Sequence, residues 1–110
     1  MRADNYPEAG KRPVSSTAPT IIENSDGSLH LVVGGAGGSR IFGSVLQVVL
    51  NVDWGMDMGQ AIGYARLHDQ LYPSVCNVEE TFPPDLREEL RARGHNVTSQ
   101  SFSVYIVYPE

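Results

Sequence analysis

A strand that ends in a run of glycines and continues directly into a helix is the feature that most restricts how this chain can fold. Residues 28–33 alternate between apolar and polar side chains, as expected for a strand that buries one face. The run GGAGGS occupies residues 34–39, and apolar residues then recur at three- and four-residue intervals from Ile41, which predicts a helix. We expect Ser39 to cap the start of this helix and Gly55 to close its end.

Such a turn presents unpaired backbone N–H groups at the positive end of a helix and therefore favours negative charge. A phosphate-binding Walker loop requires a lysine after its last glycine, whereas Gly38 is followed by Ser39 and Arg40. The dinucleotide fingerprint requires a small residue where Arg40 stands. An oxyanion hole formed by the amides of Gly37 and Gly38 remains compatible with the sequence, and so does a purely structural turn.

The remaining pattern predicts a mixed α+β layered domain. A strand at residues 20–23 and an Asp-Gly turn before residue 28 predict a hairpin. A second helix is expected to start at Asp57, with Gln60 in capping-box spacing, and to carry Ala61, Ile62, Ala65 and Leu67. We expect a strand at residues 74–78, a third helix that opens at Pro83 and Pro84 and ends at Gly94, and a last strand at residues 102–108.

Length and charge narrow the class of protein. A chain of 110 residues has the size of one domain, and its net charge of −5 argues against a nucleic-acid partner. The single cysteine, Cys76, lies among apolar neighbours and is expected to be an inert buried thiol. Residues 1–12 are polar and do not resemble a signal peptide. Asn96 begins an Asn-Val-Thr triplet that fits the N-glycosylation acceptor pattern.

Two prolines border a hydroxyl-rich segment, residues 14–18, upstream of the first strand. Proline stiffens both borders and favours extended backbone in the residues that precede it. Ser15, Ser16 and Thr17 could then offer hydroxyl groups to a carboxylate of a ligand. An ordinary proline-bordered loop is the alternative interpretation of this segment taken alone.

Four runs of this sequence, in order and with matching gaps, resemble the C-terminal part of the small subunit of γ-glutamyltransferases (glutathione hydrolases), and the likeness is to fungal members in particular. They are KRPVSSTAPTI at 11–21, GGAGGSRI at 34–41, NVDWGMD at 51–57 and ARLHDQL at 65–71. The resemblance implies part of an N-terminal nucleophile hydrolase fold (αββα), in which a threonine freed by self-cleavage attacks the γ-glutamyl carbonyl. It implies that Ser15 and Ser16 hold the α-carboxylate of the glutamyl group, and that Gly37 and Gly38 form the oxyanion hole.

The resemblance also sets expectations about partners. The substrates would be glutathione or another γ-glutamyl compound and an amino acid or dipeptide acceptor, without a metal or cofactor. We expect a single partial domain over residues 1–110 that lacks the attacking threonine, is inactive alone and needs the upstream part of the same enzyme. Residues 99–110 match the family poorly, and family members occupy the plasma membrane, the vacuole or the extracellular space. A non-catalytic anion- or peptide-binding module, or an inactive fragment, is the alternative.

Three polar residues of the fourth run, Arg66, His68 and Asp69, lie in a segment that matches the family. We expect structural roles for them, because the amine of the attacking threonine serves as its own base. His30, on the polar face of its strand, is likewise expected to be a solvated residue.

Overall fold

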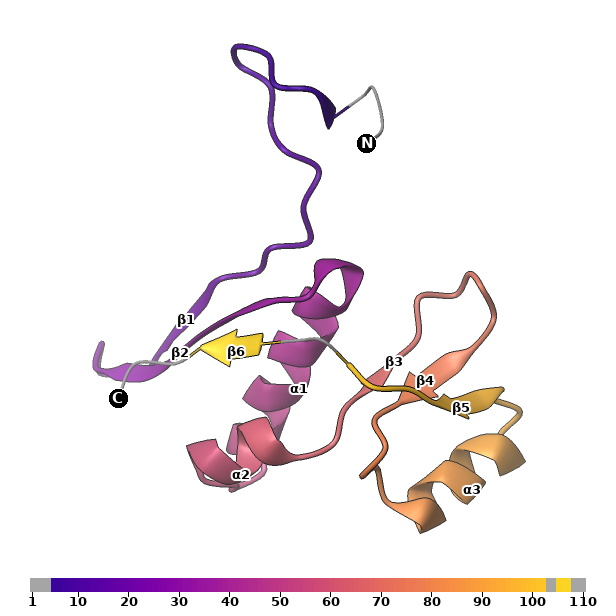
Figure 1. The fold of residues 1–110 in the computed structure, drawn as a ribbon. Helices are drawn as coiled ribbons and strands as arrows, with labels where there is room; N and C mark the ends of the chain where they lie inside the picture. Colours follow the sequence, from indigo (N-terminus) through magenta and orange to yellow (C-terminus); the bar gives the residue numbers. More distant parts are fainter. Residues whose placement is uncertain (1–4, 103–104, 108–110) are drawn as a thin grey trace.

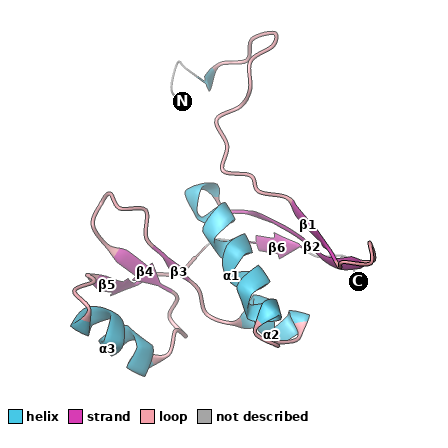
Figure 2. Cartoon of the chain, turned by 180° about the vertical axis from the view of Figure 1, so that it is seen from behind, coloured by secondary structure: helices cyan, strands magenta, loops and turns pink. Residues whose placement is uncertain are grey.

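The computed structural model describes residues 5–102 and 105–107, which form two three-stranded sheets with helices packed against them (Figure 1). The sheet orders are β1-β2-β6 and β3-β4-β5. In chain order the elements are β1 (Thr20–Glu23), β2 (Leu29–Ala36), the 3₁₀ helix η2 (Gly38–Arg40), α1 (Ile41–Asp53), α2 (Met58–Gly63), β3 (Leu67–His68), β4 (Cys76–Val78), α3 (Pro84–Ala92), β5 (Val97–Ser99) and β6 (Tyr105–Val107). Residues 6–19, upstream of β1, form a long loop that extends from the first sheet (Figure 2).

The predicted hairpin is present as β1 and β2. Gly27 takes a φ of +83° in the turn, and its N–H donates to the carbonyl of Asn24 at 2.9 Å. The strands pair antiparallel, with Thr20 opposite Val33. Strand β2 continues to Ala36, beyond the predicted end at residue 33, because its glycine-rich end pairs with β6. The glycines of this run are therefore partly strand and partly turn.

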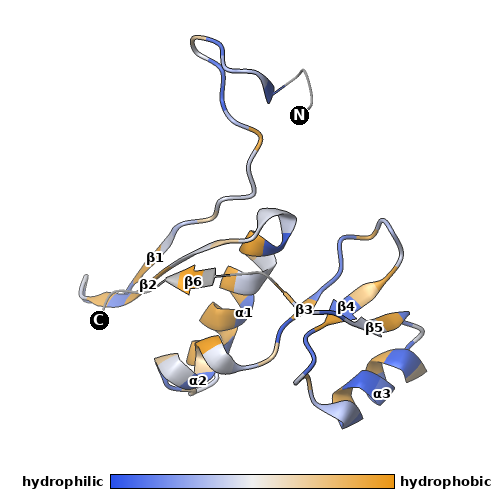
Figure 3. Ribbon diagram, viewed as in Figure 1, coloured by the Kyte–Doolittle hydropathy of each residue, from blue (hydrophilic) through white to orange (hydrophobic). Residues whose placement is uncertain are grey.

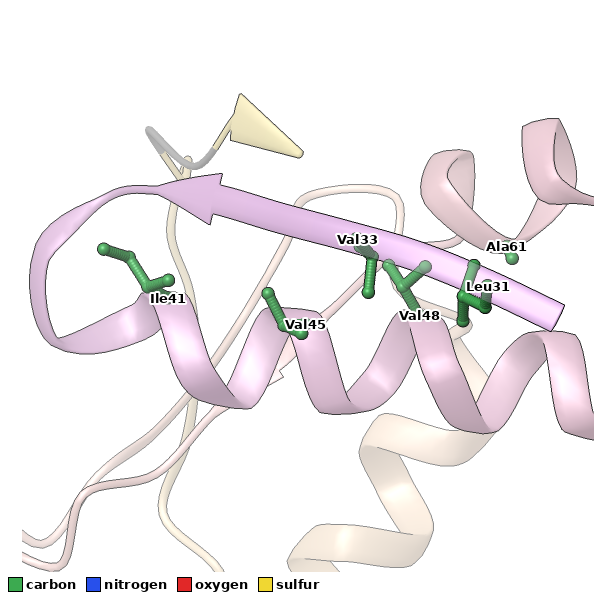
Figure 4. Close-up of a cluster of buried hydrophobic side chains, with 6 residues drawn as sticks. All are labelled: Leu31, Val33, Ile41, Val45, Val48 and Ala61. Carbon is green, nitrogen blue, oxygen red and sulfur yellow. The ribbon is translucent and has the colours of Figure 1, made fainter. Parts of the chain in front are cut away.

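The first hydrophobic core lies between β2 and α1 (Figure 4). Leu31 and Val33 point from the strand toward Val45 and Val48 of the helix, and all four side chains are buried. The predicted apolar faces of the strand and the helix thus meet each other. Leu29, which shares the alternation, lies at the end of the strand and is exposed.

Asp57 is the N-cap of helix α2, as its spacing to Gln60 predicts, and both hydrogen bonds of the capping box are present. It ends at Gly63, which is earlier than expected, because Tyr64 turns into extended backbone. The placement of Ala65 and Leu67 on this helix was wrong. Leu67 instead pairs with Val78 in β3, and both Ala65 and Leu67 pack against the second core.

The second sheet holds a smaller core formed by Cys76, Val78, Phe82 and Val97. Strand β4 is shorter than predicted and pairs with β5 in parallel. Helix α3 forms the crossover connection between these two strands. Helix α3 starts after Pro83 and is followed by Gly94 at φ +93°, as its sequence predicts. Hydrophilic residues make up most of this helix (Figure 3), and most of its charged residues are exposed. One charged residue, Arg87, is half-buried and donates hydrogen bonds to the carbonyls of the preceding loop.

Strand β6 covers part of the last predicted strand at residues 102–108. Residues 103–104 and 108–110 of that prediction lie outside the described residues. Within the described part of the chain, no helix is long and apolar enough to cross a membrane.

Candidate active site at the glycine turn

Gly37 and Gly38 form the corner between β2 and the first helical turn. Gly37 has a φ of 149° and Gly38 a φ of 64°, conformations that L-residues with a side chain rarely adopt. The sheet register ends at Ala36, and the N–H of Ile41 donates to the carbonyl of Gly38. Outside helices and strands, no described residue accepts a backbone hydrogen bond from either glycine. The N–H groups at the start of a helical turn lack partners within the turn, so this corner can donate hydrogen bonds to a ligand.

The corner borders an open hollow of about 400 Å³ whose lining is partly polar and partly apolar. Its walls come from the glycine corner and from the loop that joins β3 to β4. The lining residues are Gly37, Gly38, Ser39, Arg40, His68, Gln70, Pro73, Val75 and Asn77. The hollow therefore lies between the glycine corner and the second sheet. Among the described residues, no three His, Cys, Asp or Glu side chains gather in a way that could hold a metal ion.

Ser39 does not cap helix α1, contrary to the prediction. A 3₁₀ turn precedes the helix, so Arg40 takes the N-cap position without a side-chain capping bond. The Ser39 hydroxyl instead donates to Oε1 of Gln70 at 3.0 Å. Arg40 donates to Oε1 of Gln100 at 2.9 Å, and its guanidinium lies 4.7 Å from the ring centre of Phe102.

Ser15 and Ser16 lie in the loop before β1. Ser15 is exposed, and its hydroxyl is 2.6 Å from the hydroxyl of Thr17 and accepts the Thr17 N–H at 3.1 Å. Ser16 is half-buried. Neither serine is among the residues that line the hollow. Their role in binding a carboxylate stays a prediction, as does the oxyanion role of the two glycines.

The matched segment at 65–71 carries structural contacts. The Glu79 carboxylate accepts hydrogen bonds from the backbone N–H of Arg66 at 2.7 Å and from its Nε and Nη2 at 3.1 and 2.7 Å. The buried ring of His68 has its Nε2 3.0 Å from Oε1 of Gln70. Asp69 accepts the N–H of Leu71 at 2.8 Å.

Three other residues singled out in the sequence are not among those that line the hollow. Cys76 is buried, and burial, with a smaller contribution from Asp69, raises the pKa of its thiol, so the reactive thiolate is disfavoured. His30 is exposed on β2, as expected. Asn96 is exposed, and its side-chain amide donates to the carbonyl of Ser74 at 3.4 Å, while its glycosylation stays a prediction.

Sequence reasoning missed Gln70 and Asn77 as residues of this hollow. Gln70 reaches it from the loop after β3 and Asn77 from β4, and no local periodicity or spacing connects them with the glycine corner. The quoted run at 65–71 contains Gln70, but its contact with Ser39 spans 31 positions. Only the three-dimensional structure brings these side chains together.

The fold can be compared with those of solved proteins. The T380A mutant of Helicobacter pylori γ-glutamyltranspeptidase superposes with a TM-score of 0.82 at 34% identity, over 96% of this chain and 57% of that chain. An acivicin-inhibited γ-glutamyltranspeptidase gives a TM-score of 0.80 at 34% identity, over 100% of this chain and 61% of that one. The fold is therefore part of an N-terminal nucleophile hydrolase, which confirms the predicted α+β class.

Sequence comparison makes the assignment more specific. The family model described as Gamma-glutamyltranspeptidase matches residues 1–107. The match therefore includes most of residues 99–110, for which the motifs alone predict a poor fit to the family. A glutathione hydrolase proenzyme of Arthroderma benhamiae is 47% identical over 97 residues. The match covers 87% of this chain and 17% of that relative. This chain belongs to the γ-glutamyltranspeptidase family and spans about a sixth of the length of that relative.

Proposed function

We propose that this chain supplies two groups of contacts to the active site of a γ-glutamyl acyl-transfer enzyme. The amides of Gly37 and Gly38 would stabilise the oxyanion, and the hydroxyls of Ser15 and Ser16 would bind the α-carboxylate of the glutamyl group. The enzyme would hydrolyse glutathione and its conjugates, or transfer the γ-glutamyl group to an amino acid or peptide. The attacking threonine would come from another part of the enzyme.

The observation that carries this proposal is the register of the β1–β2 hairpin. Thr20 lies opposite Val33, and the two strands run antiparallel. The segment before Thr20 and the segment after Val33 therefore leave the hairpin at the same end. Ser16 precedes Thr20 by four positions, and Gly37 follows Val33 by four positions. The register thus supports a site to which the serines and the glycines both contribute.

The chemistry of the reaction fits this pairing of groups. Attack on the γ-glutamyl carbonyl places negative charge on its oxygen, and backbone N–H groups at a helix start stabilise that charge. The α-carboxylate carries its negative charge throughout the reaction, so hydroxyl donors stabilise the ground state and the transition state alike. The glycines would accordingly determine the rate of the chemical step, and the serines would determine affinity.

A segment exchange tests this function. The part of the Arthroderma benhamiae proenzyme that matches this chain is replaced by the chain, and p-nitroaniline release from a γ-glutamyl anilide is measured. We expect activity from the exchanged enzyme and none from the isolated chain above a heat-inactivated control. A matched control keeps the relative's own residues at the positions equivalent to 12–40 and exchanges the rest.

Each outcome of the exchange bears on the proposal. Activity of the isolated chain would contradict the proposal that the attacking threonine comes from another part of the enzyme. A folded exchange protein that is inactive, beside an active matched control, would favour a binding module or an inactive fragment, because the defect would then lie in residues 12–40.

A further inference from the structure

The glycine corner has few attachments of its own. Gly37 and Gly38 have no side chains, the sheet register stops at Ala36, and the α-helix begins only at Ile41. Side-chain contacts that hold the corner in place must therefore come from Ser39 and its neighbour Arg40. Both of these residues bond to segments that adjoin the second sheet.

Gln70 links the corner to the second sheet through both ends of its side-chain amide. Its Oε1 lies 3.0 Å from the donating hydroxyl of Ser39 and 3.0 Å from Nε2 of His68. Its Nε2 donates to the carbonyl of Tyr72 at 3.1 Å. One side chain thus makes three hydrogen bonds, and its two lone pairs and one of its protons are used.

The Tyr72 carbonyl determines which way this amide points. A carbonyl only accepts, so it must face the NH₂ group of Gln70 and not the oxygen. Oε1 is thereby directed at Ser39 and His68. Because Oε1 only accepts, His68 must carry a proton on Nε2. Oε1 of Gln70 therefore accepts hydrogen bonds from both the buried His68 ring and the Ser39 hydroxyl.

We propose that Gln70 is a positioning residue, which through Ser39 holds the Gly37–Gly38 corner in the geometry that its amides need to bind an oxyanion. The kinetic part of this inference rests on the proposed function, and the positioning itself does not. Gln70, Ser39 and His68 line the same hollow as the two glycines, so any shift of Ser39 acts on the groups next to the reacting oxygen.

The structural test uses the chain of 110 residues labelled with ¹⁵N. Gln70→Met keeps the size of the side chain and removes its hydrogen bonds, and because Gln70 is exposed we expect the variant to fold. The amide resonances of Gly37 and Gly38 should shift. Ser39→Ala should shift them in the same direction, and the double variant should add little to either single change.

Two further variants separate positioning from general loss of stability. Gln70→Glu still accepts from Ser39 and His68 but loses the hydrogen bond to the Tyr72 carbonyl, so the glycine resonances should lie between those of the native chain and those of Gln70→Met. Ser28→Ala removes a hydroxyl that bonds Asp26 at the far end of the hairpin, and it should leave the glycine corner unchanged. Unmoved glycine resonances in Gln70→Met, or equal shifts throughout α1, would overturn the inference.

The kinetic test places Gln70→Met in the exchanged enzyme. The turnover number should fall about tenfold with little change in KM, less than the roughly 10²–10³-fold loss typical when an oxyanion donor is removed. Glycine resonances that shift while kcat is unchanged would support the positioning by Gln70 and contradict the oxyanion role of the corner. A rise in KM alone would overturn the kinetic part of the inference.

Discussion

The backbone of Gly38 allows one substitution to be predicted with both sign and size. Its φ of +64° lies in the left-handed region, and a Cβ added there would meet no atom within 4 Å. Alanine would therefore clash with nothing, and its cost would be purely conformational, about 1–2 kcal/mol. The lower backbone entropy of unfolded alanine offsets about 0.4–1 kcal/mol of this. We expect Gly38→Ala to lower the free energy of unfolding by about 1 kcal/mol.

Gly43 provides a matched control within the same segment. It lies inside α1 without a positive φ, and a Cβ there also meets no atom within 4 Å. Gly43→Ala should raise the free energy of unfolding by about 0.5–1 kcal/mol, because alanine favours the helix. Gly38→Asn should cost less than Gly38→Ala, since asparagine tolerates the left-handed region.

Urea denaturation of the 110-residue chain, followed by circular dichroism, measures all three changes. The reasoning predicts opposite signs for the two alanine substitutions. It would be refuted if Gly38→Ala were as stable as the native chain, or if Gly38→Asn were less stable than Gly38→Ala.

Two further changes test other parts of the structure. Glu79→Ala leaves the Arg66 guanidinium and backbone N–H without their partner, at a site where the side chains of Arg66 and Glu79 are only 13% and 16% exposed. The free energy of unfolding, measured with urea, should therefore fall by about 3 kcal/mol. A fall of less than about 1 kcal/mol would contradict the assigned ion pair. Burial raises the pKa of the Cys76 thiol, so a disulfide reagent should modify it far more slowly in the native chain than in urea, and equal rates would refute its burial. Because the unfolded thiol loses its proton first, the stability it contributes is complete below its ordinary pKa and declines as pH rises through the raised value.

Local signals in the sequence predicted the elements whose stability is itself local. The Asp-Gly turn, the capping box of Asp57 and Gln60, and the apolar stripe of α1 each act within a few residues, and each is present. Strands β3 and β5 were missed because they are short and are defined by their pairing with β4. Nothing within two or three residues of sequence reports such a partner.

The candidate site shows the same division. The glycine corner was located because positive φ angles demand glycine, and this demand is visible in sequence. The hydroxyl of Ser39 was assigned to the wrong partner, since a 3₁₀ turn ahead of α1 and a glutamine 31 positions away compete with capping. The contribution of Gln70 and Asn77 depends on where the β3–β4 region lies relative to the glycine corner, which sequence spacing does not encode.

The division of labour between serines and glycines gives the most direct test of the central claim. In the exchanged enzyme, Ser15→Ala with Ser16→Ala should mainly raise KM and leave kcat nearly unchanged. The rise in KM should correspond to a loss of binding free energy of about 1–3 kcal/mol for each lost hydrogen bond to the carboxylate. Gly38→Ala should mainly lower kcat, by up to roughly 10²–10³-fold, because alanine disfavours the left-handed φ that aims this amide at the transition state. Equal losses in KM and kcat from both changes, or a serine variant that loses only kcat, would contradict the account.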